Sequence, residues 1–304
     1  MSRLCEDRVC IVTGGANGIG KEYALMLAEH GAKVVVNDFG GARDGTGGDS
    51  RPAQVVVDEI KAAGGEAVAN FGDVSSFSDA KEMVQQAIDT FGRLDVLINN
   101  AGILRDRMLV NMTEAEWDAV IAVHLKGTFG PAHHAAAYWR DQSKAGTPVD
   151  ARLINTSSVS GIYGNIGQTN YGAAKAGIAS FTVIASRELK RYGVRVNCIA
   201  PGALTRMTED LVPGEITDEM KQQRSPRWVA PIAVWLASEE SKDVTGRIFE
   251  ASGSVLAVAE GWRRGPTVDP IDDPTKMGDV ARALVDQARM NAGMDGQDLD
   301  GTRD

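Results

Sequence analysis

The stretch that decides the fold lies at residues 9–20 and reads VCIVTGGANGIG. Its first four residues are typical of a short buried strand, and a helical pattern follows from Lys21 to Glu29. The turn between them has the pattern T-G-x-x-x-G-x-G. Gly14 and Gly18 let the backbone turn tightly and approach a pyrophosphate, and Gly20 lets the helix pack close to the sheet. A glycine-rich turn in this position predicts a nucleotide-binding site.

The alternation of strand and helix continues along most of the chain. Apolar, β-branched runs predict strands at 9–12, 33–36, 67–70, 96–98, 152–155, 194–199 and 247–250, and helical patterns lie between them at 21–29, 53–62, 79–90, 114–129 and 171–192. Continuous apolar strands separated by helices indicate a parallel sheet that is covered on both faces. The expected fold class is therefore α/β: a single doubly wound Rossmann domain with a seven-stranded parallel sheet at residues 1–265, and a C-terminal extension at residues 266–304.

Two segments interrupt this alternation. Residues 40–50 read GGARDGTGGDS, which is consistent either with a flexible surface loop or with a functional element. The C-terminal extension begins with three spaced prolines, which are typical of a linker, and then shows a helical pattern from Lys276 to Asn291. The apolar face of that helix is narrow, so we expect it to dock on its own subunit or on a neighbouring one to be stable.

Charge and composition exclude several classes of protein. The chain has 304 residues with 41 acidic and 32 basic side chains, so its net charge of −9 argues against nucleic acid or an anionic membrane as the main partner. No apolar run approaches the roughly 18 residues of a membrane-spanning helix, and residues 1–8 lack a signal-peptide core. We expect a cytoplasmic protein in which Cys5, Cys10 and Cys198 are buried and reduced. The histidines lack metal-ligand spacing, so no metal site is predicted.

An acidic residue follows the second predicted strand. Asp38 comes 18 residues after Gly20, where a dinucleotide-binding fold places the acid that bonds the adenosine ribose hydroxyls. A carboxylate there repels the extra phosphate of NADP, so NAD is the expected cofactor. Arg43 is a nearby cation that could instead govern this choice, and an ordinary acidic turn residue is the other interpretation of Asp38.

Three further residues suggest proton-transfer chemistry. Ser158 follows the fifth predicted strand, Tyr171 comes 13 residues later, and Lys175 lies four residues beyond, on the same helical face. A phenol has a pKa of about 10, and a neighbouring ammonium lowers that pKa toward the neutral range. The serine hydroxyl can hold a carbonyl or alcohol oxygen against the phenol. A Tyr-x-x-x-Lys pair alone is common and usually structural, so its meaning depends on the upstream nucleotide motif.

Taken together, these motifs resemble the short-chain dehydrogenase/reductase family from about Arg8 to Glu260. The resemblance implies an oxidoreductase that interconverts a secondary alcohol and a ketone, with Ser158, Tyr171 and Lys175 as catalytic residues. The cofactor-binding residues that it implies are Gly14, Asn17, Gly18, Ile19, Gly20, Asp38, Asp73, Val74, Asn100, Ala101, Gly102, Tyr171, Lys175, Pro201, Gly202 and Thr205. It also implies a homo-oligomer, most simply a homotetramer. The segment from Arg206 to Trp228 mixes polar and apolar residues, contains two prolines and lacks a strand pattern, so we expect it to form the substrate lid.

A narrower likeness concerns the substrate. The segments NDFGG (37–41), GILRDR (102–107), VHLKG (123–127) and GIYGN (161–165) resemble the D-specific 3-hydroxyacyl-CoA dehydrogenase region of peroxisomal multifunctional enzyme type two and its bacterial relatives. This implies a 3-hydroxyacyl-CoA substrate, with fatty or steroid-derived acyl parts. Most members of the wider family place an asparagine where this chain has His124, so that side chain either relays protons or is purely structural. The alternatives are a hydroxysteroid or other small-alcohol dehydrogenase and, in a different class, a non-catalytic NAD-binding redox sensor.

Overall fold

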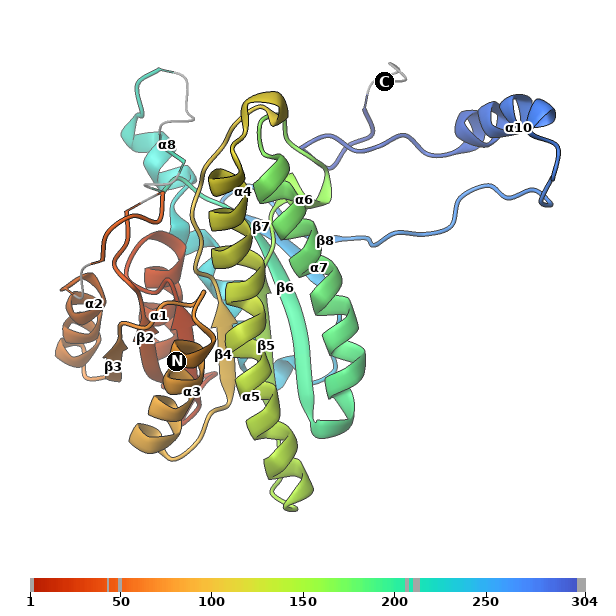
Figure 1. Ribbon diagram of the computed structural model, residues 1–304. Coiled ribbons are helices and arrows are strands. Elements are labelled where there is room, and N and C mark those ends of the chain that lie inside the picture. Colours follow the sequence, from red (N-terminus) through yellow and green to blue (C-terminus); the bar gives the residue numbers. More distant parts are fainter. Residues whose placement is uncertain (1–2, 43, 49–50, 206–207, 210–213, 300–304) are drawn as a thin grey trace.

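The computed structural model describes residues 3–42, 44–48, 51–205, 208–209 and 214–299 (Figure 1). Its centre is a sheet that contains eight strands within these residues, in the order β3-β2-β1-β4-β5-β6-β7-β8. The strands are β1 (Val9–Thr13), β2 (Lys33–Asn37), β3 (Glu66–Asn70), β4 (Val96–Asn99), β5 (Ala151–Thr156), β6 (Val194–Gly202), β7 (Ile248–Ser252) and β8 (Leu256–Ala259). The first seven pair in parallel, as predicted, and β8 adds an antiparallel edge that the sequence analysis missed.

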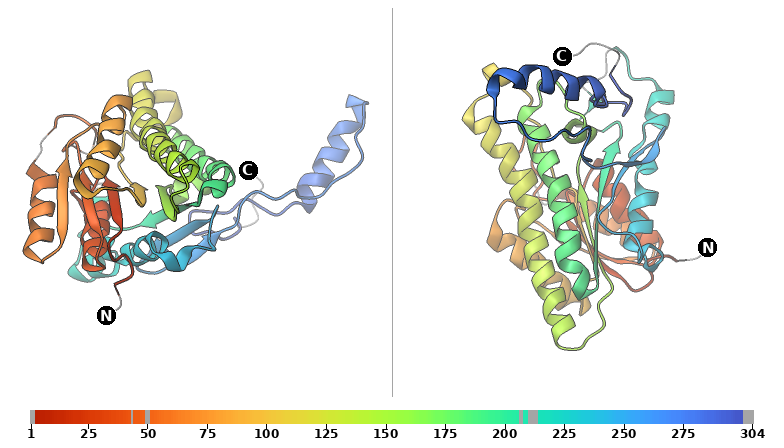
Figure 2. Two further views of the ribbon diagram at one scale, coloured as in Figure 1. Left: turned by 90° about the horizontal axis from the view of Figure 1, so that it is seen from below. Right: turned by 90° about the vertical axis from the view of Figure 1, so that its right-hand side faces the viewer.

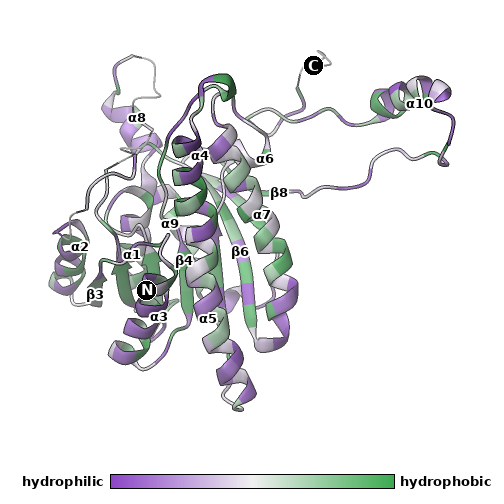
Figure 3. Ribbon diagram, in the orientation of Figure 1, coloured by the Kyte–Doolittle hydropathy of each residue, from purple (hydrophilic) through white to green (hydrophobic). Residues whose placement is uncertain are grey.

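Helices cover both faces of the sheet. Alternate residues of a strand point to opposite sides, and the apolar side chains on each side pack against helices. On one face, Cys10 and Val12 of β1 pack with α1 (Gly18–Glu29), α2 (Arg51–Ala62) and α9 (Ala230–Ala237). On the other, Val9 and Ile11 pack with α3 (Phe77–Phe91), α5 (Gly127–Lys144) and α7 (Thr169–Leu189). Figure 3 shows apolar strands at the centre and polar outer surfaces on helices such as α2. The predicted Rossmann-like α/β fold is therefore confirmed.

The helix predicted at residues 114–129 differs from the observed one. It begins as α4 (Glu114–Ile121), passes through a π-helical turn at Ala122–Lys126, and continues as α5 to Lys144. The observed helix therefore continues past residue 129, where the predicted one ends, and contains Pro131. Pro131 is tolerated because it lies just after the π turn, where the regular ladder of helix hydrogen bonds is already interrupted.

The C-terminal extension leaves the body of the protein after β8. Its helix α10 (Pro274–Gln287) stands away from the sheet and its helices in both Figure 1 and Figure 2, and none of its residues is buried. The chain then returns, so that Gly296 lies next to the hydroxyl of Tyr163. The predicted helix is thus observed, two to four residues displaced at its ends, but it docks neither on its own subunit's core nor on a surface within the described residues.

Several smaller predictions can be placed. The three cysteines are buried and free. Within the described ranges, no helix is both long enough and apolar enough to cross a bilayer; a cytoplasmic location stays a prediction.

Arg43, and residues 206–207 and 210–213 of the predicted lid, lie outside the described residues. The rest of that lid contains the short helix α8 (Asp218–Gln223). The short helix α6 (Val159–Ile162) follows β5.

The strand order explains where a ligand would bind. Strands β1 and β4 are neighbours in the sheet although two strands separate them along the chain, so the connections from these two strands run to opposite sides. In open α/β sheets, ligands bind in the crevice at the carboxyl ends of strands at such a reversal. The glycine-rich turn after β1 and the Asn-Ala-Gly run after β4 both lie at this edge.

Candidate active site

The turn after β1 has the geometry of a phosphate-binding loop. Gly14 and Gly18 adopt left-handed backbone conformations, with φ of +63° and +51°. A Cβ on Gly14 would lie 2.8 Å from Cα of Ala101, and a Cβ on Gly20 would collide with the carbonyl oxygen of Gly14. Asn100 fixes the turn because its Nδ2 donates to the carbonyl oxygens of Thr13 (3.0 Å) and Gly14 (3.2 Å). These glycines leave the backbone open for close approach by a pyrophosphate, so the site fits a dinucleotide.

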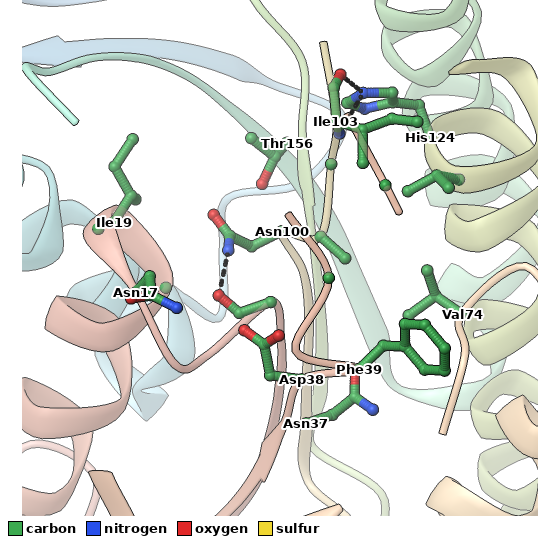
Figure 4. Close-up of a pocket in the computed structure, with 18 of the residues that line it drawn as sticks. Asn17, Ile19, Asn37, Asp38, Phe39, Val74, Asn100, Ile103, His124 and Thr156 are labelled. Carbon is green, nitrogen blue, oxygen red and sulfur yellow. Dashed lines mark hydrogen bonds between the residues drawn. The ribbon is translucent and has the colours of Figure 1, made fainter. Parts of the chain in front are cut away.

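Asp38 lies at the end of β2 and joins two loops. Its Oδ2 accepts a hydrogen bond from the amide of Ala16 (3.0 Å), and its Oδ1 accepts one from the amide of Gly40 (2.8 Å). In Figure 4, Asp38 and Phe39 lie at one end of the pocket, and Ile103 with His124 lies at the other. Backbone amides therefore fix the carboxylate at this end of the pocket, and its contact with an adenosine ribose stays a prediction.

One pocket gathers most of the predicted cofactor residues. Every residue in that set lines it except Gly202, which lies at the end of β6 beside Ser252 of β7. The pocket is also lined by residues that the sequence analysis did not select, namely Asn37, Phe39, Gly41, Ala42, Gly45, Gly72, Ile103, Val123, His124 and Thr156. Asn37 and Thr156 could have been found, because both end strands at the same edge of the sheet. No group of three or more His, Cys, Asp or Glu side chains in the described residues could hold a metal ion.

The predicted catalytic residues come together at the same edge. Ser158 precedes α6, and Tyr171 and Lys175 lie in the first turns of α7. The Nζ of Lys175 donates to the carbonyl oxygen of Thr156 (2.7 Å) and lies 5.6 Å from the centre of the Tyr171 ring. Tyr171 and Lys175 line the dinucleotide pocket, and Ser158 lies close enough to Tyr171 for its hydroxyl to lower the pKa of the phenol. The arrangement places a phenol, a hydroxyl and an ammonium around one position.

The pKa values differ from the expectation for an ammonium next to a phenol. Burial raises the pKa of Tyr171 to about 12, although its hydrogen bond with Ser158 opposes this rise; the charge of Asp106 adds to it. Burial lowers the pKa of Lys175 to about 8. The ammonium lies over the ring face and bonds to a carbonyl, not to the phenolic oxygen. Desolvation therefore outweighs the predicted lowering of the phenol pKa by Lys175.

His124 is buried beside this group, with only 2% of its surface exposed. Its Nε2 faces the backbone of Ile103, 2.7 Å from the carbonyl oxygen and 3.1 Å from the amide nitrogen, and its ring meets the Tyr171 ring edge-on at 5.1 Å. Burial lowers the pKa of His124 to about 3, so the ring is neutral at physiological pH. A Cβ on Gly102 would collide with this ring. His124 therefore supports the Ile103 backbone and the tyrosine without carrying charge.

Comparison with known proteins decides the family. The family model described as short chain dehydrogenase matches residues 8–215. The chain belongs to this family. Peroxisomal multifunctional enzyme type 2 of Drosophila melanogaster is 44% identical over 278 residues, covering 88% of this chain and 43% of that protein. A hydroxyacyl-CoA dehydrogenase of Mycobacterium tuberculosis is 48% identical over 254 residues, covering 81% of this chain and 77% of that protein. The crystal structure of a short chain dehydrogenase from Mycobacterium avium superposes with a TM-score of 0.85 at 51% identity, covering 95% of this chain and 98% of that one.

These likenesses confirm the predicted family and its narrower group. This dehydrogenase is an oxidoreductase that acts on CH–OH groups, and its family generally uses nicotinamide cofactors. It spans less than half the length of the fly enzyme.

Proposed function

We propose that this dehydrogenase interconverts the 3-hydroxyl and 3-oxo forms of acyl-CoA thioesters with NAD as its cofactor. The observation that carries the proposal is the continuous pocket that extends from Asp38 to Tyr171 and Lys175. Two relatives support it. One, 44% identical, is named a peroxisomal multifunctional enzyme type 2, and the other, 48% identical, is named a hydroxyacyl-CoA dehydrogenase. The carboxylate of Asp38 supports NAD over NADP, because it would repel a phosphate on the adenosine ribose.

The chain's own residues would supply the proton transfer. The nicotinamide ring takes or gives the hydride when the cofactor is bound. In the oxidation, Tyr171 accepts the hydroxyl proton of the alcohol as the C–H bond breaks, and in the reduction it returns that proton to the oxygen. The Ser158 hydroxyl holds the reacting oxygen. Because burial raises the pKa of Tyr171 to about 12, accepting this proton requires the positive charges of Lys175, whose Nζ lies 5.6 Å from the centre of the tyrosine ring, and of the oxidised cofactor.

The test is a substrate and cofactor panel followed by NADH absorbance. We expect turnover with D-3-hydroxyacyl-CoA thioesters and NAD, less with the L-isomers, and less with NADP. Free hydroxysteroids and short secondary alcohols are tested separately as alternative substrates. The Tyr171→Phe variant serves as the catalytic control. A higher kcat/KM for a free steroid or alcohol than for every thioester would overturn the substrate assignment. A preference for NADP would overturn the cofactor assignment.

We also propose that the enzyme is a homo-oligomer that assembles through α4, α5 and α7. Each of these helices exposes a large apolar side chain, namely Trp117, Phe129 and Ile184. Covering such side chains with a second copy would remove apolar surface from water. Light scattering at micromolar concentration is expected to give at least a dimer mass, and a monomer mass would refute the proposal.

A further inference from the structure

The glycine-rich segment after Asp38 lies over the dinucleotide pocket. We refer to its described residues, 40–42 and 44–48, as the clasp. Gly41, Ala42 and Gly45 of the clasp line the pocket, together with Phe39 immediately before it. The clasp is therefore part of the wall of the cofactor site, which the sequence analysis had left open between a surface loop and a functional element.

Internal hydrogen bonds give the clasp a defined shape. The amide of Ala42 donates to the carbonyl oxygen of Thr46 (2.8 Å), and the amide of Gly45 donates back to the carbonyl oxygen of Ala42 (2.9 Å). The side chain of Asp44 accepts from the amide (3.0 Å) and the hydroxyl (2.7 Å) of Thr46. A loop closed on itself in this way can act as one unit.

The clasp is attached on both sides of the pocket. On the β2 side, the amide of Gly40 donates to Asp38, whose other oxygen accepts from the phosphate loop. On the β4 side, Nε of Arg105 donates to the carbonyl oxygen of Asp44 (2.9 Å). Close packing adds to this second attachment, since a Cβ on Gly45 would lie 3.2 Å from two carbon atoms of the Ile103 side chain. The clasp thus connects the β2 side of the pocket to the β4 side.

We propose that Arg105 is a positioning residue that holds the clasp against a bound dinucleotide, and that Gly45 lets the clasp lie close to Ile103, where a Cβ would press on the isoleucine side chain at 3.2 Å. This inference rests on the proposed cofactor. The clasp forms part of the pocket wall, so loss of the Arg105 bond would loosen its contact with a bound dinucleotide and raise the dissociation rate. Arg105 touches neither the reacting atoms nor the Tyr171 hydroxyl, so its effect falls on cofactor binding.

Two variant pairs test the proposal by NADH binding, without a substrate. Arg105→Gln removes the guanidinium, and Arg107→Gln is the control because Arg107 pairs with Glu116 instead of the clasp. Gly45→Ala adds a methyl group facing Ile103, and Gly47→Ala is the control because Gly47 has a similar backbone conformation (φ +74° against +86°) and would meet no atom within 4 Å. NADH fluorescence gives Kd, and stopped-flow displacement gives the dissociation rate.

We expect Arg105→Gln to weaken NADH binding about 3- to 10-fold, the range for losing one hydrogen bond of ordinary net strength, because water weakens this exposed bond; most of the change should lie in the dissociation rate. Gly45→Ala should weaken binding more than Gly47→Ala, whose backbone strain is equivalent. Equal Kd values and dissociation rates within both pairs would overturn the inference while leaving the cofactor assignment intact. If the unaltered enzyme bound no NADH, the proposed cofactor itself would be wrong, and the role of the clasp would fall with it.

Discussion

Replacing Lys175 with methionine should stabilise the protein at neutral pH and destabilise it near pH 10. Only 3% of the Lys175 surface is exposed, and burial lowers its pKa from the ordinary 10.5 to about 8. At about 1.4 kcal/mol for each tenfold change in proton affinity, holding the ammonium in this site costs about 3 kcal/mol. Methionine has a similar shape and no charge, so it removes this cost. It also leaves the Thr156 carbonyl without the ammonium, a loss of about 1–2 kcal/mol.

The direction of the pH dependence follows from proton binding. Below pH 8, Lys175 is protonated in both the folded and unfolded states, so the full cost of burying the charge is present. Between pH 8 and 10.5, the unfolded chain holds a proton that the folded protein lacks, so the stability of the wild type rises with pH relative to the variant. We expect Lys175→Met to be about 1–2 kcal/mol more stable at pH 7, and less stable than the wild type near pH 10.

Urea denaturation of both proteins at pH 7 and pH 10, without cofactor, measures this difference. Other groups that titrate at high pH are shared by the two proteins, so the comparison isolates Lys175. Lys144→Met, at the exposed end of α5, is the matched control and should change the free energy of unfolding by less than about 0.5 kcal/mol at both pH values. A difference between Lys175→Met and the wild type that is the same at both pH values would refute the reasoning.

Three further variants address catalysis, the cofactor and the C-terminal extension. Tyr171→Phe should bind NADH with nearly unchanged Kd but lose at least about 100-fold in kcat, because the phenolic oxygen carries the proton; retention of a tenth of kcat would exclude that role. Asp38→Ala should narrow the ratio of kcat/KM between NAD and NADP, and an unchanged ratio would assign the choice to another group. Truncation after Gly265 should leave hydride transfer on short acyl substrates intact. A rise in KM confined to long acyl chains would place the extension at the substrate site, and loss of all activity with the fold intact would contradict its dispensability.

The sequence was sufficient for the parallel core of the fold because buried parallel strands are nearly continuous apolar runs. It was insufficient for β8, where the segment Leu256–Ala259 is short and Leu256 is 70% exposed. Such a tetrapeptide has no distinguishing periodicity, and its pairing depends on the turn after β7. Likewise, the continuation of α5 past Pro131 depends on the π turn, which local propensity does not encode.

In the site, too, motifs within one segment could be predicted, whereas contacts between segments far apart in the sequence could not. The glycine-rich turn and the spacing of Tyr171 and Lys175 are local patterns with a direct chemical meaning, so they were accessible from the sequence. The bond between Arg105 and the Asp44 carbonyl joins residues 61 positions apart, and neither segment carries a pattern that predicts the other. The high pKa of Tyr171 was also inaccessible, because it arises from burial by several elements of the fold.

The packing of Gly20 bears on how this enzyme family can lose activity. A Cβ there would strike the Gly14 carbonyl oxygen inside the protein itself, whether or not a cofactor is bound. Every other amino acid carries a Cβ, so any missense change at this codon strains the junction between β1 and α1. A related protein that had lost its activity would still need Gly20 to fold. Lys175 lowers the stability of the fold, so such a protein could replace it with another residue. We therefore expect inactive relatives to keep the glycine-rich turn after β1 while the tyrosine and lysine of the catalytic pair are substituted.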